Sequence, residues 1–253
     1  MKTLALLMTL VMTTGLLAQQ PRRMTYVVVH GAWGGGWDWR HVDSLLSTHG
    51  HKVYRPSLTG LGERVHLASG NIGLATHIDD VVNVILWENL HHVVLIGHSY
   101  GGMVITGVAD RVPERLAHLI YVDAMLPDSG ESVAAIMGRG SAASLIGNVQ
   151  NGLIPATWES AEKPVPKDVP HPLKTFTDTI HLRRERVAKT PATYILTFEP
   201  GREPDAFQPF ADRATARKFR VLRMQADHVP ERSAPVELTR LLLPAEPIMR
   251  PRR

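Results

Sequence analysis

The stretch Val93-Val94-Leu95-Ile96-Gly97-His98-Ser99-Tyr100-Gly101-Gly102 decides the fold of this chain. Its first four residues form an apolar, β-branched run typical of a buried strand. Gly102-Met103-Val104-Ile105 then has the character of the start of a buried helix. A strand, a Gly-x-Ser-x-Gly pattern and a helix together indicate a nucleophile elbow, in which Ser99 occupies a tight, strained turn with its hydroxyl exposed. Side chains two residues before and after this serine would collide with the neighbouring strand and helix, so both positions favour glycine.

Strand-like and helix-like segments alternate outward from the elbow, beginning at Thr25. This alternation predicts an α/β fold, with a mostly parallel central sheet and helices on both faces. The expected strands are Thr25–Val29, Lys52–Arg55, Val93–Ile96, Leu119–Val122, Tyr194–Phe198 and Phe219–Met224. Helical stripes are expected around 39–46 and 76–85, and a last helix is expected from Pro235.

The stretch from about 124 to 190 interrupts this alternation. It is rich in glycine and proline and contains no clear sheet strand. We therefore expect residues 21–253 to form one large α/β domain, in which the segment of about 124–190 is a cap inserted over the functional face.

The segment Met1–Ala18 has the pattern of a secretory signal peptide. Lys2 gives a positive start, the residues up to Leu17 are mainly apolar, and Ala18 is a suitable cleavage residue. We expect a secreted or periplasmic protein with no stable membrane span after removal of the signal. The chain has no cysteine, so it cannot form a disulfide.

The composition excludes some partners. The 253 residues carry a formal net charge of +4, but no basic stripe is interleaved with aromatic residues, so we expect no nucleic-acid partner. No metal-ligand spacing is present, and we expect neither a metal nor a cofactor. The oligomeric state is left open.

A serine hydroxyl needs a base, and the base needs an acid that orients it. In an elbow fold these residues follow one another along the chain as Ser, acid and His. His228 comes directly after the last expected strand, where a loop can return to Ser99. We expect Asp227 beside it to shape that loop.

Two backbone N–H groups are expected to form an oxyanion hole. One belongs to Tyr100, and the other to Ala32 in the loop His30-Gly31-Ala32-Trp33-Gly34-Gly35-Gly36. A phosphate-binding loop is the alternative, but the Gly-x-Gly-x-x-Gly spacing and an acidic ribose ligand are missing.

The segments His30–Trp33, Gly97–Gly102 and Asp227-His228 resemble the α/β-hydrolase fold family. Within it they are similar to the esterase group that holds plant methyl esterases, hydroxynitrile lyases and bacterial pyrethroid-type carboxylesterases. The resemblance implies a cofactor-free serine hydrolase acting on carboxylic ester bonds.

The acid is where the chain departs from the plant members of this group. They carry an Asp after the penultimate strand, and Pro200 stands at that place here. Asp123 ends an earlier strand in a setting that resembles the haloalkane dehalogenases, so Asp123 is the favoured acid. Glu199 and Asp205 stay open as alternatives.

We therefore expect a serine carboxylesterase that hydrolyses small to medium hydrophobic carboxylic esters through an acyl-enzyme. A non-enzymatic or weakly hydrolytic ligand-binding homologue is one alternative. A hydroxynitrile lyase is another, although the Lys that resembling lyases carry after the catalytic His is replaced by Val229.

Overall fold

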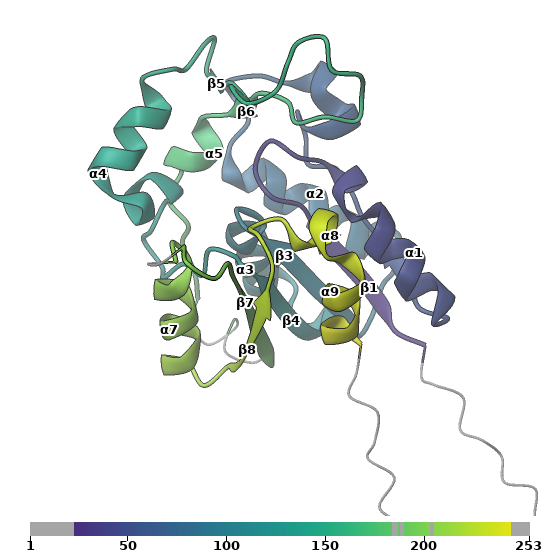
Figure 1. Cartoon of the computed structure of the whole chain (residues 1–253). Helices are drawn as coiled ribbons and strands as arrows, with labels where there is room; N and C mark the ends of the chain where they lie inside the picture. Colours follow the sequence, from purple (N-terminus) through teal and green to yellow (C-terminus); the bar gives the residue numbers. More distant parts are fainter. Residues whose placement is uncertain (1–22, 184–186, 188–189, 203–204, 244–253) are drawn as a thin grey trace, which may run out of the picture.

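The computed structural model describes residues 23–183, 187, 190–202 and 205–243 (Figure 1). The expected signal peptide, Met1–Ala18, lies outside the described residues. Six parallel strands form one sheet in the order β2-β1-β3-β4-β7-β8. Their bounds are β1 Thr25–Val29, β2 Lys52–Tyr54, β3 Val93–His98, β4 Leu116–Val122, β7 Ala192–Phe198 and β8 Arg220–Gln225. The predicted α/β fold is thus confirmed.

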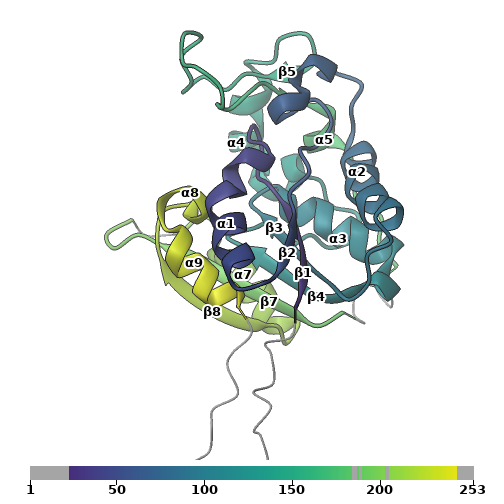
Figure 2. The same cartoon turned by 90° about the vertical axis from the view of Figure 1, so that its right-hand side faces the viewer.

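Helices cover both faces of the sheet (Figure 2). Helices α1 (Arg40–Thr48) and α9 (Pro235–Leu242) lie on one face, and α2 (Leu74–Trp87) and α3 (Gly101–Arg111) lie on the other. Helix α7 (Gln208–Ala216) packs into the same core as α2 and α3. A short helix, α8 (Pro230–Ser233), precedes α9.

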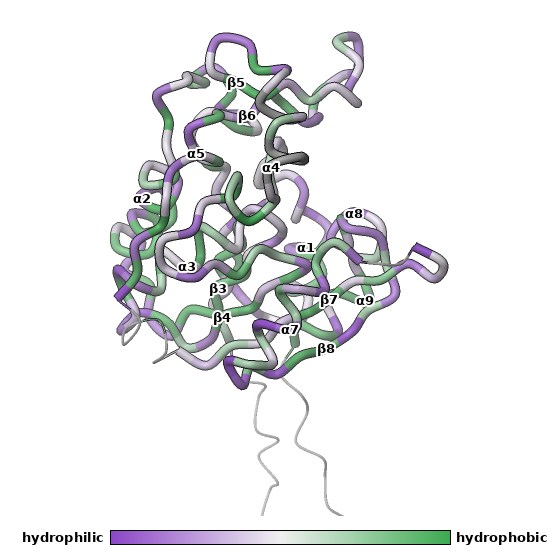
Figure 3. Tube along the Cα trace, turned by 90° about the vertical axis from the view of Figure 1, so that its left-hand side faces the viewer, coloured by the Kyte–Doolittle hydropathy of each residue, from purple (hydrophilic) through white to green (hydrophobic). Residues whose placement is uncertain are grey.

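The central strands β1 and β3 are apolar on both sides because both faces of the sheet are buried there. In β1, Val27 and Val29 belong to the core under α2 and α3, whereas Tyr26 and Val28 belong to the core under α1 and α9. Successive side chains of a strand point to opposite faces, which explains this division. Figure 3 shows the hydrophobic stretches gathered in the central strands.

All six expected strands are present, and only their ends differ. The strand β4 begins three residues earlier than expected, at Leu116, and β7 begins two residues earlier, at Ala192. The added residues at the start of β4 and β7 pair with the neighbouring strands, but they do not form a continuous run of buried apolar side chains, which is the pattern that marks a strand in the sequence. No described helix is long and apolar enough to cross a lipid bilayer.

The chain leaves the sheet between β4 and β7. This excursion contains α4 (Val133–Ile146), β5 (Leu153–Ile154), β6 (His171–Pro172) and α5 (Lys174–Thr177). In Figure 1 these elements lie together above the sheet. No sheet strand was expected here, but β5 and β6 pair as a separate antiparallel ribbon. Two residues each are too few to produce a periodic pattern in the sequence.

Candidate active site

Ser99 lies in the turn between β3 and α3 with a φ of +52°, a left-handed conformation that is strained for a side chain with a Cβ. The flanking glycines make this turn possible. A Cβ on Gly101 would lie 2.7 Å from the carbonyl oxygen of Val29, and one on Gly97 would lie 2.7 Å from that of Gly101. The turn can approach β1 and α3 this closely only where both positions lack a side chain.

The predicted base is in contact with the predicted nucleophile. Nε2 of His228 lies 2.9 Å from the hydroxyl oxygen of Ser99. The loop carrying His228 is shaped by Asp227, which accepts hydrogen bonds from the Val229 amide at 2.9 Å and the Ser233 hydroxyl at 2.7 Å. Phe207 stacks on the imidazole, with the ring centroids 4.5 Å apart and the planes at 21°.

Asp123 follows β4 and lies on the other side of the imidazole. It is buried, and its Oδ2 lies 2.6 Å from Nδ1 of His228. Its Oδ1 accepts a hydrogen bond from the Thr197 amide of β7 at 3.2 Å. With the proton on Nδ1, His228 donates to Asp123 and accepts from Ser99, which is the protonation pattern that a general base requires.

The two alternative acids lie close by but are otherwise engaged. Glu199 and Asp205 line an open pocket of about 370 Å³ together with Asp123 and His228. Glu199 pairs with Arg202 at 3.1 Å, and Asp205 accepts the Phe207 amide at 2.8 Å. Of the three candidates, the structure brings only Asp123 to His228.

The predicted oxyanion loop packs against the elbow. A Cβ on Gly31 would lie 3.3 Å from Cβ of Ser99, so the backbone here passes directly beside Ser99. Among the described residues, none accepts a hydrogen bond from the amides of Ala32 or Tyr100. Tyr100 directly follows Ser99, and Ala32 directly follows Gly31, so both amides belong to the two segments that meet at Ser99.

Trp33 ties the oxyanion loop to the excursion above the sheet. Its amide donates to Nδ1 of His171 at 3.2 Å, and its indole N–H donates to the carbonyl of Ile154 at 3.1 Å. Its own carbonyl accepts from the Val169 amide at 2.9 Å. Burial lowers the pKa of His171 well below its usual value, which keeps the ring neutral and able to accept.

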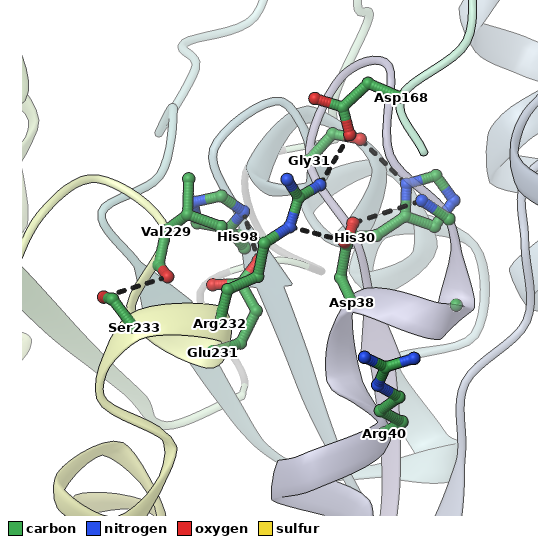
Figure 4. Close-up of polar contacts among 12 residues, drawn as sticks. His30, Gly31, Asp38, Arg40, His98, Asp168, Val229, Glu231, Arg232 and Ser233 are labelled. Atoms are coloured by element: carbon green, nitrogen blue, oxygen red, sulfur yellow. Dashed lines mark hydrogen bonds and ion pairs between the residues drawn. The ribbon is translucent and has the colours of Figure 1, made fainter. Parts of the chain in front are cut away.

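A second polar network lies beneath the site (Figure 4). His98 pairs with Glu231 of α8 at 2.9 Å. Next to it, Arg232 pairs with Asp38 at 2.7 Å and with Asp168 at 2.6 Å. Sequence reasoning missed His171, Glu231 and Arg232. No motif marked them, because their partners are far away along the chain.

The described residues contain no group of three or more His, Cys, Asp or Glu side chains that could hold a metal ion. The hydroxyl of Ser99 contacts His228, which in turn contacts Asp123.

Comparison with known proteins agrees with this fold. A family model described as the alpha/beta hydrolase family matches residues 26–241. The carbendazim hydrolyzing esterase of Nocardioides sp. (strain SG-4G) is 49% identical over 114 residues, which are 45% of this chain and 47% of that protein. Methylesterase 2 of Arabidopsis thaliana is 29% identical over 118 residues, 46% of this chain and 45% of that protein. The chain thus spans about half the length of the curated relatives it matches.

Two solved structures extend the likeness over most of the chain. An extracellular alpha/beta-hydrolase from a Paenibacillus species has a TM-score of 0.74 at 24% identity, covering 87% of this chain and 97% of its own. A pyrethroid hydrolase from Sphingobium faniae JZ-2 has a TM-score of 0.67 at 21% identity, covering 87% and 96%. At these identities the likeness is one of fold.

Proposed function

The chain belongs to the alpha/beta hydrolase family, and from that premise we propose that it is a serine carboxylesterase with Ser99, His228 and Asp123 as its catalytic residues. One observation carries the proposal: the hydroxyl of Ser99, the ring of His228 and the carboxylate of Asp123 form one hydrogen-bonded row, with steps of 2.9 and 2.6 Å. Relatives named for the hydrolysis of carbendazim and for methylesterase activity support an ester as the substrate.

The proposed reaction is acyl transfer in two steps. His228 takes the Ser99 proton as Oγ attacks the ester carbonyl, and the amides of Ala32 and Tyr100 bind the resulting oxyanion. His228 then gives the proton to the leaving alcohol, which leaves an acyl group on Ser99. Water, deprotonated by His228, attacks this acyl-enzyme and releases the acid, while Asp123 stabilises the imidazolium in both steps.

We propose small to medium hydrophobic carboxylic esters as the substrates. Aromatic rings support this choice, because Trp33 next to the oxyanion loop lies 5.0 Å from Trp158 and 5.7 Å from Phe176 between ring centroids. Both partners come from the segment of about 124–190, which we propose acts as a cap. Rings of this kind bind an apolar acyl or alcohol group well.

The first test is hydrolysis of p-nitrophenyl esters over a series of acyl lengths, with Ser99→Ala and the matched control Ser47→Ala on the exposed face of α1. Ser99→Ala is expected to lower kcat by about 10⁴-fold or more, and Ser47→Ala to leave it unchanged. A fluorophosphonate probe is expected to label the wild type at Ser99. Activity that survives Ser99→Ala would contradict the mechanism, and tight ester binding without turnover would favour a ligand-binding protein.

We also propose that the chain is exported to the periplasm or the medium, on the strength of the Met1–Ala18 pattern. N-terminal sequencing of the protein recovered from each cell fraction tests this. A mature protein that still begins at Met1 in the cytoplasmic fraction would contradict it.

A further inference from the structure

Glu231 is a carboxylate with no exposed surface, and it lies three residues after the proposed base. Its partner is His98, the residue directly before the nucleophile, which is also buried. Oε1 of Glu231 lies 2.9 Å from Nδ1 of His98. Figure 4 shows the two side chains facing one another between α8 and the end of β3. A charged carboxylate is this deeply buried only where a cation or several donors compensate it.

The groups that contact the two ring nitrogens of His98 indicate which of these nitrogens carry a proton. Nδ1 faces the carboxylate of Glu231, and Nε2 lies 2.6 Å from the backbone carbonyl oxygen of His228. Both partner atoms are acceptors, and a neutral imidazole has only one N–H. Both contacts are favourable when His98 is an imidazolium, with Nε2 donating to the His228 carbonyl oxygen and the charged ring beside the Glu231 carboxylate.

The elbow therefore holds the base at two points. Ser99 contacts the ring of His228, and the preceding residue, His98, holds the backbone of the same histidine. Two neighbouring residues of one rigid turn thus determine where the ring and the main chain of the base lie. Proton transfer depends steeply on such placement, because an error of about 1 Å costs about 100-fold in rate.

Several charged or titratable groups face His98. They are Glu231 from α8, His228 from the loop before it, Asp123 from the loop after β4 and His30 from the loop after β1. Burial by itself lowers the pKa of His98, but the charge and hydrogen bond of Glu231, the His228 carbonyl and Asp123 outweigh it and raise the pKa. The charged form is therefore retained above the pH at which an ordinary histidine loses its proton, and is lost as the pH rises further.

We propose that Glu231 and His98 form a buried ion pair that fixes the backbone of His228 in line with Ser99, which makes Glu231 a positioning residue for ester hydrolysis. The proposal rests on the proposed function, since it assigns a role in that reaction. Glu231 does not touch the reacting atoms and acts through His98.

The test replaces Glu231 with Gln, which keeps the shape and removes the charge. The matched control is Glu237→Gln on the exposed side of α9, where the carboxylate pairs with Arg240. Glu231→Gln is expected to lower kcat by about 10- to 100-fold, to leave KM within about twofold, and to move the alkaline fall of kcat to lower pH. Glu231→Asp is expected to recover part of the loss, and Glu237→Gln to behave as the wild type.

A second measurement needs no substrate. In ¹⁵N NMR of the resting wild type near neutral pH, His98 is expected to show a proton on both ring nitrogens, and in Glu231→Gln on one. If no ester is turned over, the proposed function fails while this spectrum still tests the ion pair. A singly protonated His98 in the wild type overturns the proposal, as does a Glu231→Gln enzyme with kcat within about twofold of the wild type. If Glu231→Gln fails to fold, the wild-type spectrum and Glu231→Asp decide.

Discussion

Asp123, which directly follows β4, contacts His228, whereas Glu199, which directly follows β7, pairs with Arg202. Oδ2 of Asp123 lies 2.6 Å from Nδ1 of the histidine, 105 residues further along the chain. Its other oxygen accepts the amide of Thr197 on β7, the strand next to its own β4. The carboxylate is thus held by its own position after β4 and by the amide of β7, whereas Glu199 pairs with Arg202 and Asp205 accepts the Phe207 amide.

Asp123→Asn is expected to lower kcat by about 10⁴-fold, because an amide at this place no longer stabilises the imidazolium or its tautomer. Glu199→Gln is the control, since that carboxylate pairs with Arg202 instead. Ester hydrolysis with purified variants measures both. Full activity in Asp123→Asn together with loss in Glu199→Gln would transfer the role of acid to Glu199.

Gly31→Ala is expected to lower kcat by about tenfold or more with little change in KM. The new Cβ would lie 2.9 Å from Nδ1 of His98 and would push the oxyanion loop away from Ser99. Gly147→Ala, at the helical end of α4, adds the same methyl group far from the elbow and serves as control. Equal kcat values for the two variants would refute the assignment of the loop.

Asp38→Asn is expected to destabilise the protein by about 1–3 kcal/mol, because the buried Asp38 carboxylate binds both Arg232 and the Gly35 amide. Asp168→Asn is expected to cost less than about 1 kcal/mol, since Arg232 is one third exposed there and keeps Asp38. Urea unfolding curves give both free energies. If Asp168→Asn were the more destabilising of the two changes, the contact of Arg232 with Asp168 would be stronger than its contact with Asp38.

His77 is expected to make the protein less stable in acid. Burial lowers its pKa to about 4, while its backbone contact with Thr59 and the charge of Asp80 oppose this. Between about pH 4 and pH 6.5, the histidine of the unfolded chain therefore binds more protons than the buried His77 of the folded chain. The stabilisation is complete above about pH 6.5 and is lost as the pH falls toward 4, by about 3 kcal/mol in all.

This effect is measured by urea unfolding of the wild type and His77→Gln at the two ends of that pH range. The free-energy gap between them is expected to narrow at the acid end. His66→Gln, which changes an exposed histidine, is the control. A gap that is constant with pH would show that His77 does not titrate between the folded and unfolded states.

The sequence predicted the parts of the site that local patterns determine. Ser99 has its glycines and its strand beside it, and His228 has the end of a strand before it, so both positions follow from short stretches. Asp123 was favoured because a carboxylate ends the strand after the elbow unit. Its catalytic role, like those of Ser99 and His228, stays a prediction.

The contacts that hold these residues in place could not be predicted in the same way. Glu231 reads as an exposed polar residue of a short helix, and only the packing of α8 against the elbow reveals that it is buried against His98. His171 lies among prolines and meets Trp33 across 138 residues. Such pairs depend on the tertiary fold, and no periodic pattern marks them.

The pairing of β3 with β4 places His98 opposite Val122, so Ser99 and Asp123 are the residues that directly follow a paired position of two neighbouring strands. The hydrogen bonds between β3 and β4 therefore set the distance between these two residues. The sequence of the excursion after β4 can change without moving them. A graft of a relative's excursion onto this sheet would retain the row of Ser99, His228 and Asp123 while changing which esters fit. The graft must replace the contacts that the excursion makes with Trp33. These are acceptors for its amide and its indole N–H, now His171 and Ile154, and a donor for its carbonyl, now Val169. The residues at the strand ends and the excursion that covers them can thus change separately, provided that the contacts of Trp33 with His171, Ile154 and Val169 are kept.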